Sequence, residues 1–219
     1  MQLSSLRFSA PEKRLTLWLG AAALSFGIFV KITSELLEHE VRGLDLSILT
    51  AVAKMRRPWL TGVAVDITAL GSLALVVLIS VVALCLFLSL ENRLAAWQLF
   101  LNTAGAGIWT GITKNAIERA RPEEVTHLVQ VTGFSYPSGH SLVSASLYLT
   151  MALLAARHLP TRKGRVLLFV LAIAIISLVG MSRVYLGVHY PSDVASGVLL
   201  GVAWALLLEG GFSTIERRV

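Results

Sequence analysis

Residues 182–208 have the sequence SRVYLGVHYPSDVASGVLLGVAWALLL, in which a short polar segment is followed by an apolar run. The run 194–208 contains Gly197 and Gly201, whose spacing allows a second helix to approach closely in lipid. An apolar helix is the usual way for a chain to cross the roughly 30 Å of hydrocarbon in a bilayer. The stretch therefore predicts a membrane-spanning helix that begins directly after a cluster containing arginine, histidine and aspartate.

The composition of the whole chain agrees with a membrane protein. Of its 219 residues, 55% are hydrophobic and 15% are charged, with a mean hydropathy of +0.73. An ordinary soluble domain carries about 25% charged residues. The net charge of +6 could suggest a nucleic acid as partner, but the cations are divided among short loops rather than gathered on one face. We therefore expect the bilayer and anionic lipid head groups as partners, and no nucleic acid.

Six apolar runs can be interpreted as membrane spans. They cover residues 15–32, 60–90, 94–113, 141–156, 166–181 and 194–208. The second run exceeds what a bilayer needs, so we expect it to tilt or to project into water. Gly107 and Gly111 repeat the spacing of Gly197 and Gly201, and we expect helix packing at both pairs. The predicted fold class is all-α: one integral-membrane domain over residues 1–219, built as a six-helix bundle.

The segment between the first two spans has an amphipathic pattern. Over residues 45–57, apolar Leu46 and Leu49 are interspersed with Asp45, Lys54 and two arginines. This pattern is typical of a short helix that lies on the membrane surface. Such a helix could guide a substrate or could simply connect two spans.

The basic residues indicate an orientation. No small-residue cleavage site follows the basic start of the chain, so we expect an uncleaved first span. Segments on the side of the two termini contain ten Lys/Arg, against nine on the other side. Without Lys114, Arg121 and Arg183, which chemistry could require, the comparison is ten against six. The positive-inside rule then favours cytoplasmic termini.

Three short polar segments, residues 114–122, 137–140 and 182–193, are predicted to meet on one face of the membrane. The first two share the loop between the third and fourth spans, and the third segment follows the fifth span. Two spans separate these loops, so they emerge on the same side. Residues far apart in the sequence can thus form one site.

The first segment supplies two cations. Lys114 and Arg121 are seven residues apart, or about two helical turns. If the third span continues beyond the membrane surface, both project from one face, and Pro122 ends the helix. Arginine offers a planar fork for phosphate oxygens and lysine a compact charge. The alternative is that both side chains only snorkel at the interface.

The second segment is Pro137-Ser138-Gly139-His140, directly before the fourth span. A helix N-terminus favours an anion, so His140 could face a bound phosphate and protonate a leaving oxygen. The alternative is a solvated histidine at the interface.

The third segment combines Arg183, His189 and Asp193. A neutral imidazole is a competent nucleophile when its other ring nitrogen donates to a carboxylate, and Asp193 lies four residues after His189. The alternatives are a His–Asp pair with a structural role only, or a metal site. Arginine and lysine near the histidines would repel a divalent cation, so we expect neither a metal nor another cofactor.

These residues resemble the three signature motifs of the type 2 phosphatidic acid phosphatase superfamily. The matching positions are Lys114-x6-Arg121-Pro122, Pro137-Ser138-Gly139-His140 and Ser182-Arg183-x5-His189-x3-Asp193, and every signature position is filled. The start of the second span, Arg57-Pro58-Trp59-Leu60, is similar to the bacterial phosphatidylglycerophosphatase B branch. Soluble haloperoxidases and acid phosphatases also carry these motifs, but six spans disfavour them here.

The resemblance implies a phosphohistidine intermediate on His189, which Asp193 orients. His140 would protonate the leaving group and then activate water. Five residues would hold the phosphoryl oxygens: Lys114, Arg121, Ser138, Gly139 and Arg183. The resemblance also implies a site at the outer, periplasmic face of the bacterial cytoplasmic membrane.

The expected function is therefore that of a membrane lipid phosphate phosphatase. Its substrate would be undecaprenyl diphosphate or phosphatidylglycerol phosphate, with the 1-phosphate of lipid A as the alternative. A lipid transporter or scramblase is disfavoured because its ionisable groups should lie near the bilayer midplane, whereas these lie at span ends.

Five further polar residues lie outside the matching motif positions. Glu118 and Arg119, between the two cations of the first motif, could steer substrate or belong to a solvated helix face. His127 and Tyr136 could contact a head group. Asp66 should lie near the interface or bond within the bundle.

Overall fold

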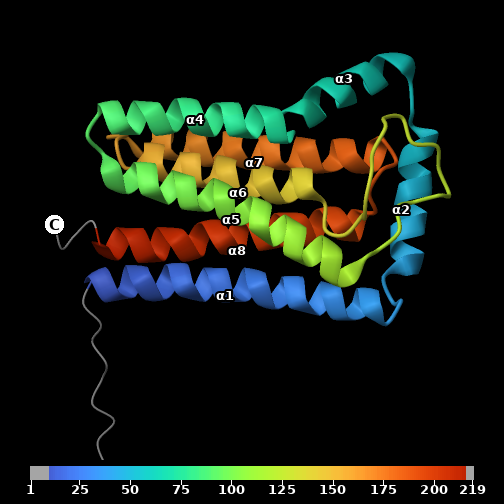
Figure 1. Cartoon of the computed structure of the whole chain (residues 1–219), viewed down its shortest axis with the longest axis horizontal. Coiled ribbons are helices and arrows are strands. Elements are labelled where there is room, and N and C mark those ends of the chain that lie inside the picture. The colour runs from blue at the N-terminus through green and yellow to red at the C-terminus, as the bar shows by residue number, and fades with distance from the viewer. Residues whose placement is uncertain (1–9, 216–219) are drawn as a thin grey trace, which may run out of the picture.

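The computed structural model describes residues 10–215, and predictions for the start of the chain fall largely outside this range. Within it the protein is all-helical, without strands, which confirms the all-α part of the predicted fold class. The helices are α1 (Ala10–Leu37), α2 (Arg42–Lys54), α3 (Pro58–Ala69), α4 (Leu73–Ser89), α5 (Arg93–Ile117), α6 (Gly139–Ala156), α7 (Arg162–Tyr185) and α8 (Pro191–Ile215). The bundle is formed by α1 and α4 to α8, which run along the long axis, and α2 lies across one end (Figure 1).

Local sequence signals start several of these helices. Ser72, Asn92, Ser138 and Thr161 are N-caps of α4 to α7, and each side chain accepts a hydrogen bond from the backbone N–H three residues later. Such caps satisfy donors that a helix leaves unpaired at its first turn. Pro58 and Pro191 stand in the first turns of α3 and α8, where a missing N–H costs nothing.

The distribution of polarity indicates that the bilayer surrounds the bundle. Leu24, Leu73 and Leu78 are exposed by 67%, 71% and 58%, whereas polar Gln98 and Asn102 are completely buried. A soluble protein would show the reverse arrangement. By length and composition, the described chain has four helices that could cross a membrane, α1, α6, α7 and α8, or five if α3 and α4 form one broken span.

The third predicted span, α5, is long enough but too polar to count among these helices. Its polar side chains Gln98 and Asn102 face the protein interior. Average hydropathy cannot distinguish a polar residue that faces lipid from one that faces a neighbouring helix.

The second predicted span is not one long helix. It breaks at Leu70–Ser72 into α3 and α4, which are inclined by 43°. Ser72 caps the new helix, and Gly71 sits against α6 and α7 so tightly that a Cβ would lie 2.7 Å from Ser144 Oγ and from Val179 Cγ1. Residues 60–90 thus form parts of two helices joined by a break, where the sequence predicted one span.

Glycines bring α8 against α6. A Cβ on Gly197 would lie 2.5 Å from Ser138 O, and one on Gly201 would lie 2.4 Å from Leu142 O. The expected packing at this pair is confirmed. The expectation for Gly107 and Gly111 is wrong, because no atom lies within 4 Å of a Cβ built on either.

A polar cluster ties the bundle together at the end remote from α2. Arg157 donates to Glu209 Oε2 over 2.6 Å, and Gln98 donates to the same oxygen over 2.9 Å. These three residues come from the end of α6, from α8 and from the start of α5. The cluster therefore links α5, α6 and α8 at this end of the bundle.

Candidate active site

The three polar segments meet at the end of the bundle that α2 covers (Figure 1). The first two lie at the end of α5 and the start of α6, and the third follows α7 and precedes α8. His140 is within electrostatic range of Lys114, Arg121, Arg183 and His189. The predicted convergence on one face is thus present in the structure.

His189 and Asp193 form the expected contact. Nδ1 of His189 lies 3.4 Å from Asp193 Oδ2, and the two side chains are 2% and 0% exposed. Asp193 lies in the first turn of α8, so the four-residue spacing brings its carboxylate back toward the preceding loop. The carboxylate can hold the proton on Nδ1, which leaves Nε2 as the ring nitrogen with a free lone pair.

Two further donors fix the same carboxylate oxygen. Ser135 donates its hydroxyl to Asp193 Oδ2, and the backbone N–H of Tyr190 donates to it over 2.9 Å. Ser135 Oγ also lies 3.3 Å from His189 Nδ1. Ser135 was not predicted from the sequence, although it lies only two residues before Pro137 of the second motif.

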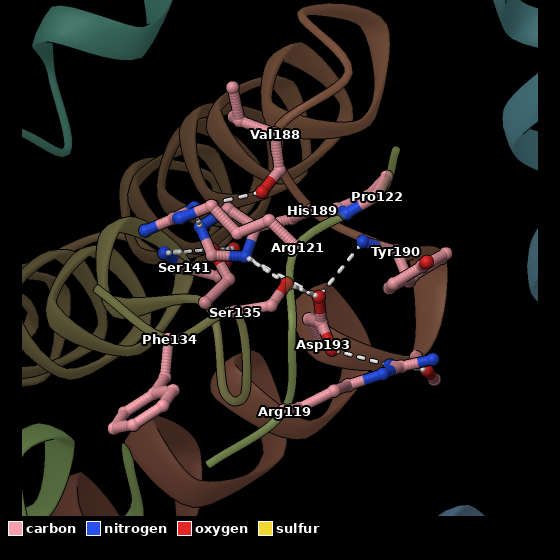
Figure 2. A network of polar contacts seen from close by, with 12 residues as sticks. Arg119, Arg121, Pro122, Phe134, Ser135, Ser141, Val188, His189, Tyr190 and Asp193 are labelled. Atoms are coloured by element: carbon pink, nitrogen blue, oxygen red, sulfur yellow. Dashed lines mark hydrogen bonds and ion pairs between the residues drawn. The ribbon is translucent and has the colours of Figure 1, made fainter. Parts of the chain in front are cut away.

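Arg119 binds the other carboxylate oxygen. Its Nη1 donates to Asp193 Oδ1 over 2.5 Å, and its Nη2 donates to Asp45 of α2 over 2.7 Å. Figure 2 shows Asp193 between Arg119 on one side and Ser135 with the nitrogen of Tyr190 on the other. The expectation that Arg119 lies on a solvated helix face is therefore wrong, and Asp45 is buried rather than at a polar surface.

Arg121 reaches the site from an extended segment, not from a helix. α5 ends at Ile117 because Glu118 adopts a left-handed conformation with φ of 48°. The predicted two-turn helix between Lys114 and Arg121 is thus wrong, as is a helix stop at Pro122. The chain turns back, and Arg121 Nη1 donates to Val188 O over 2.8 Å and lies 3.4 Å from His189 Nε2.

Lys114 and Arg183 complete the cationic surroundings. Lys114 Nζ donates to the carbonyls of Phe134 and Ser135. Arg183 is buried, and its Nη1 donates to Thr68 at the end of α3 over 2.9 Å. Its Nε has no hydrogen-bond partner among the described residues, so this donor is free to bind an anion's oxygen.

Ser138, Gly139 and His140 form the N-terminus of α6. Ser138 Oγ accepts hydrogen bonds from Ser141 N and Ser141 Oγ, over 3.4 Å and 2.9 Å. The backbone N–H of Ser138 donates to Asp193 O over 2.9 Å, which connects this segment directly to α8. The unpaired N–H groups of the first turn and the helix dipole favour an anion beside His140.

The electrostatics of the site follow from burial among cations. Burial, together with the charges of Arg183 and Arg121, lowers the pKa of His189 to about 4, against the opposing effect of Asp193. His189 is therefore neutral at pH 7. Burial also lowers the pKa of Arg121, whereas Asp193 and Asp45 outweigh burial at Arg119 and raise its pKa. Each arginine keeps its charge at neutral pH.

The glycine in the loop before His189 is required by geometry. Gly187 has a φ of +78°, and a Cβ there would lie 2.5 Å from Arg56 Nη2 and 2.8 Å from Thr126 O. Arg56 in turn donates to Tyr185 O over 3.0 Å. The loop is therefore held by the segment between α2 and α3 as well as by Asp193.

The other polar residues considered in the sequence have contacts or exposure that set them apart from the His189–Asp193 pair. His127 Nε2 is 2.6 Å from Pro122 O, and Tyr136 is buried with its hydroxyl 2.6 Å from Thr33 Oγ1 of α1. Neither position indicates contact with a head group. Asp66 is exposed on α3, and Glu118 is exposed at the end of α5. In the described chain, no group of three or more His, Cys, Asp or Glu residues is arranged to hold a metal ion.

Comparison with known proteins agrees with this geometry. Residues 95–214, more than half of the chain, match the PAP2 superfamily. The sequence is 34% identical to phosphatidylglycerophosphatase B of Bacillus subtilis (strain 168), over 88% of this chain and 95% of that protein. It is 36% identical to a lipid A 1-phosphatase of Rhizobium johnstonii, over 50% of this chain and 44% of that protein.

The fold has a solved counterpart. The crystal structure of a transmembrane PAP2-type phosphatidylglycerolphosphate phosphatase from Bacillus subtilis matches with a TM-score of 0.81 and 31% sequence identity. The match covers 90% of this chain and 98% of that one. The resemblance seen in the sequence motifs is confirmed by the family match, by a relative that spans nearly the whole chain and by the shared fold: the chain belongs to the PAP2 superfamily and is a phosphatase of that family.

Proposed function

We propose that this phosphatase hydrolyses a membrane lipid phosphate through a covalent phosphohistidine on His189. The observation that carries the proposal is the surroundings of this imidazole. Nδ1 faces Asp193 at 3.4 Å, while Nε2 faces Arg121 Nη1 at 3.4 Å. A phosphoryl group held by Arg121 is therefore presented to the nitrogen whose lone pair is free.

The phosphoryl oxygens are bound by groups from all three motifs. Lys114, Arg121 and Arg183 supply positive charge, and Ser138 and Gly139 supply the helix N-terminus. Cations and backbone donors that are fixed in advance stabilise the charge that spreads over these oxygens in the transition state.

Two steps complete the reaction. Nε2 of His189 forms a bond to phosphorus as the bond from phosphorus to the lipid oxygen breaks, and His140 gives its proton to that oxygen. Asp193 stabilises the imidazolium on His189. Neutral His140 then takes a proton from water, whose oxygen displaces His189 and releases inorganic phosphate.

The substrate class follows from the relatives and the membrane setting. The relative that spans nearly the whole chain is a phosphatidylglycerophosphatase B, which supports phosphatidylglycerol phosphate. Undecaprenyl diphosphate offers the same terminal phosphate on a longer hydrocarbon. The half-length match to a lipid A 1-phosphatase keeps that lipid as the alternative.

We also infer six membrane spans in one domain: α1, the broken pair α3–α4, α5, α6, α7 and α8. The long parallel helices and the outward-facing leucines support this count. The active-site end would face the periplasm, with both chain ends in the cytoplasm. An even number of spans and the excess of Lys/Arg on the side of the termini support that orientation.

The direct test is phosphate release from a panel of lipid phosphates by the purified protein in detergent. His189→Ala should reduce turnover at least about 1000-fold, because the covalent route is lost. His158→Ala, which removes an exposed histidine at the far end of α6, is the matched control and should retain turnover. Normal turnover by His189→Ala would exclude the nucleophile. An absolute need for a divalent ion after EDTA treatment would exclude the metal-free mechanism.

A further inference from the structure

Asp45 is the one buried carboxylate of α2, on a helix that is otherwise largely exposed. Both of its oxygens accept hydrogen bonds from residues far along the chain. Oδ1 accepts from Ser192 N over 2.9 Å, and Oδ2 accepts from Ser192 Oγ over 2.5 Å and from Arg119 Nη2 over 2.7 Å. Asp45 therefore connects the helix across the end of the bundle to the start of α8.

Arg119 is fixed on three sides. Nη2 is bound by Asp45, and Nη1 donates to Asp193 Oδ1 and, over 2.8 Å, to Ser192 Oγ. The centre of the guanidinium lies 4.0 Å from the centroid of the Tyr190 ring. Its side chain is only 15% exposed, so the arrangement is held in a largely dry environment.

The contact with Asp193 complements that of His189. His189, Ser135 and the backbone N–H of Tyr190 all address Oδ2, whereas Oδ1 receives Arg119. With donors on both oxygens, the plane of the carboxylate cannot rotate away from the imidazole. Figure 2 shows Arg119 on the side of Asp193 that faces away from Ser135 and Arg121. It is thus poorly placed to bind the phosphate that Arg121 would hold.

We propose that Arg119, locked by Asp45 of α2, is a positioning residue that orients Asp193 for catalysis at His189. The surface helix α2 then acts as a brace for the nucleophile loop and not as a substrate guide or a plain connector. This inference rests on the proposed role of the His189–Asp193 pair. It assigns a mechanistic role to two ion pairs, Arg119–Asp45 and Arg119–Asp193, each of which joins residues 74 positions apart in the sequence.

The test exploits a cavity of about 370 Å³ beside Arg119, lined among others by Val41, Ile117 and Tyr190. Arg119→Ala should lower kcat by about 10- to 100-fold, the effect seen when hydrogen-bond partners of metal-bound histidines are removed. KM should change little, because Arg119 does not touch substrate. Millimolar ethylguanidinium can enter this cavity and should restore part of kcat, while ethylammonium, which lacks the planar fork, should not.

Two milder variants keep the test valid if Arg119→Ala does not fold. Arg119→Lys and Asp45→Asn should also lower kcat, and the double variant should be no worse than Arg119→Lys alone, because both changes act through one contact. Asp66→Asn, the same type of change at an exposed carboxylate on α3, should have no effect.

The outcomes distinguish a failure of the positioning role of Arg119 from a failure of the proposed function. Wild-type kcat in both Arg119→Lys and Asp45→Asn would overturn the inference, and so would a rise in KM at constant kcat, since that identifies a substrate-binding arginine. Loss of kcat without guanidinium rescue but with a matching fall in thermal stability would also overturn it. Full activity in His189→Ala would instead remove the proposed nucleophile, and with it the premise of the inference.

Discussion

At the scale of single residues, the site is built around a histidine that stays neutral among cations. The proposed mechanism requires this neutrality, because a protonated His189 has no lone pair with which to attack phosphorus. Asp193 favours the imidazolium that forms after attack, while burial and the neighbouring arginines disfavour it beforehand. The residue is thus kept reactive before the step and is stabilised after it.

This balance predicts the pH dependence of the reaction. Because the pKa of His189 is lowered to about 4, kcat/KM should stay high down to mildly acidic pH and fall as the pH drops through about 4. A pH–rate profile in detergent measures this acid limb. An acid limb near the ordinary value for histidine, about 6.5, would contradict the assignment.

Ser135 should contribute through the same carboxylate. Ser135→Ala removes the hydroxyl that donates to Asp193 Oδ2 and leaves this buried oxygen one donor short. We expect kcat to fall by about 10- to 150-fold, which corresponds to the roughly 1.5–3 kcal/mol of one hydrogen bond to a charged group. Ser141→Ala, at a buried serine that contacts Ser138 instead, serves as the comparison for local packing. An equal effect of both substitutions on kcat would count against a specific role for Ser135.

At the scale of elements, the relation of α6 to α8 sets the distance between His140 and Asp193. The two helices approach until backbone meets backbone, at Gly197 beside Ser138 and at Gly201 beside Leu142. Close approach of this kind depends on the absence of side chains. A methyl group at either position must therefore move one helix.

The two glycine pairs of the chain offer a matched experiment. In Gly197→Ala the new Cβ would lie 2.5 Å from Ser138 O, so we expect a loss of about 1–3 kcal/mol in stability and a fall in kcat. In Gly107→Ala the new Cβ meets nothing within 4 Å, so both quantities should stay near wild type. Thermal unfolding and turnover in the same detergent measure the two effects. Equal tolerance of both changes would contradict the packing described for α6 and α8.

At the scale of the whole molecule, the proposed active site and a stabilising polar cluster lie at opposite ends of the helix bundle. The proposed phosphate site occupies the end of the bundle that α2 covers (Figure 1), and Gln98, Arg157 and Glu209 link α5, α6 and α8 at the other end. Breaking a buried ion pair costs about 3–5 kcal/mol, and less where a partner is partly exposed, as Arg157 is. The far end can therefore be altered without changing the site.

Glu209→Gln should accordingly lower the stability of the protein by about 1–3 kcal/mol while kcat is unchanged. Gln98→Glu combined with Glu209→Gln moves the carboxylate across the same cluster, where Arg157 already contacts Gln98 at 3.3 Å. The double variant should regain part of the lost stability. Thermal unfolding with parallel turnover checks this expectation, and a large loss of kcat in Glu209→Gln would show that the two ends are coupled.

The sequence predicted what depends on local spacing and on the order of spans. His189 and Asp193, four residues apart, are in contact, and the three motifs meet on one face as the alternation of spans requires. The helix expected from Lys114 to Arg121 failed because Glu118, a residue without glycine's freedom, takes a left-handed conformation. No local pattern indicates such a turn.

Contacts between residues far apart in the chain could not be predicted from the sequence either. Arg119 binds Asp45 and Asp193 across 74 residues in each direction, and neither contact follows from periodicity. The one available signal was an aspartate among apolar residues on a surface helix. The predicted span at residues 94–113 is a helix in the structure, but its mean hydropathy is too low to count it among the candidate spans, since it includes the buried polar residues Gln98 and Asn102.

The hydrogen bond from Ser138 N to Asp193 O joins the segment that carries the proposed acid to the helix that carries the partner of the nucleophile. It uses main-chain atoms alone, so any residue other than proline at position 138 could form it. The backbone therefore fixes the position of the proposed acid, His140, relative to Asp193. A substitution at a side chain that faces the lipid can then leave the spacing of these two groups unaltered.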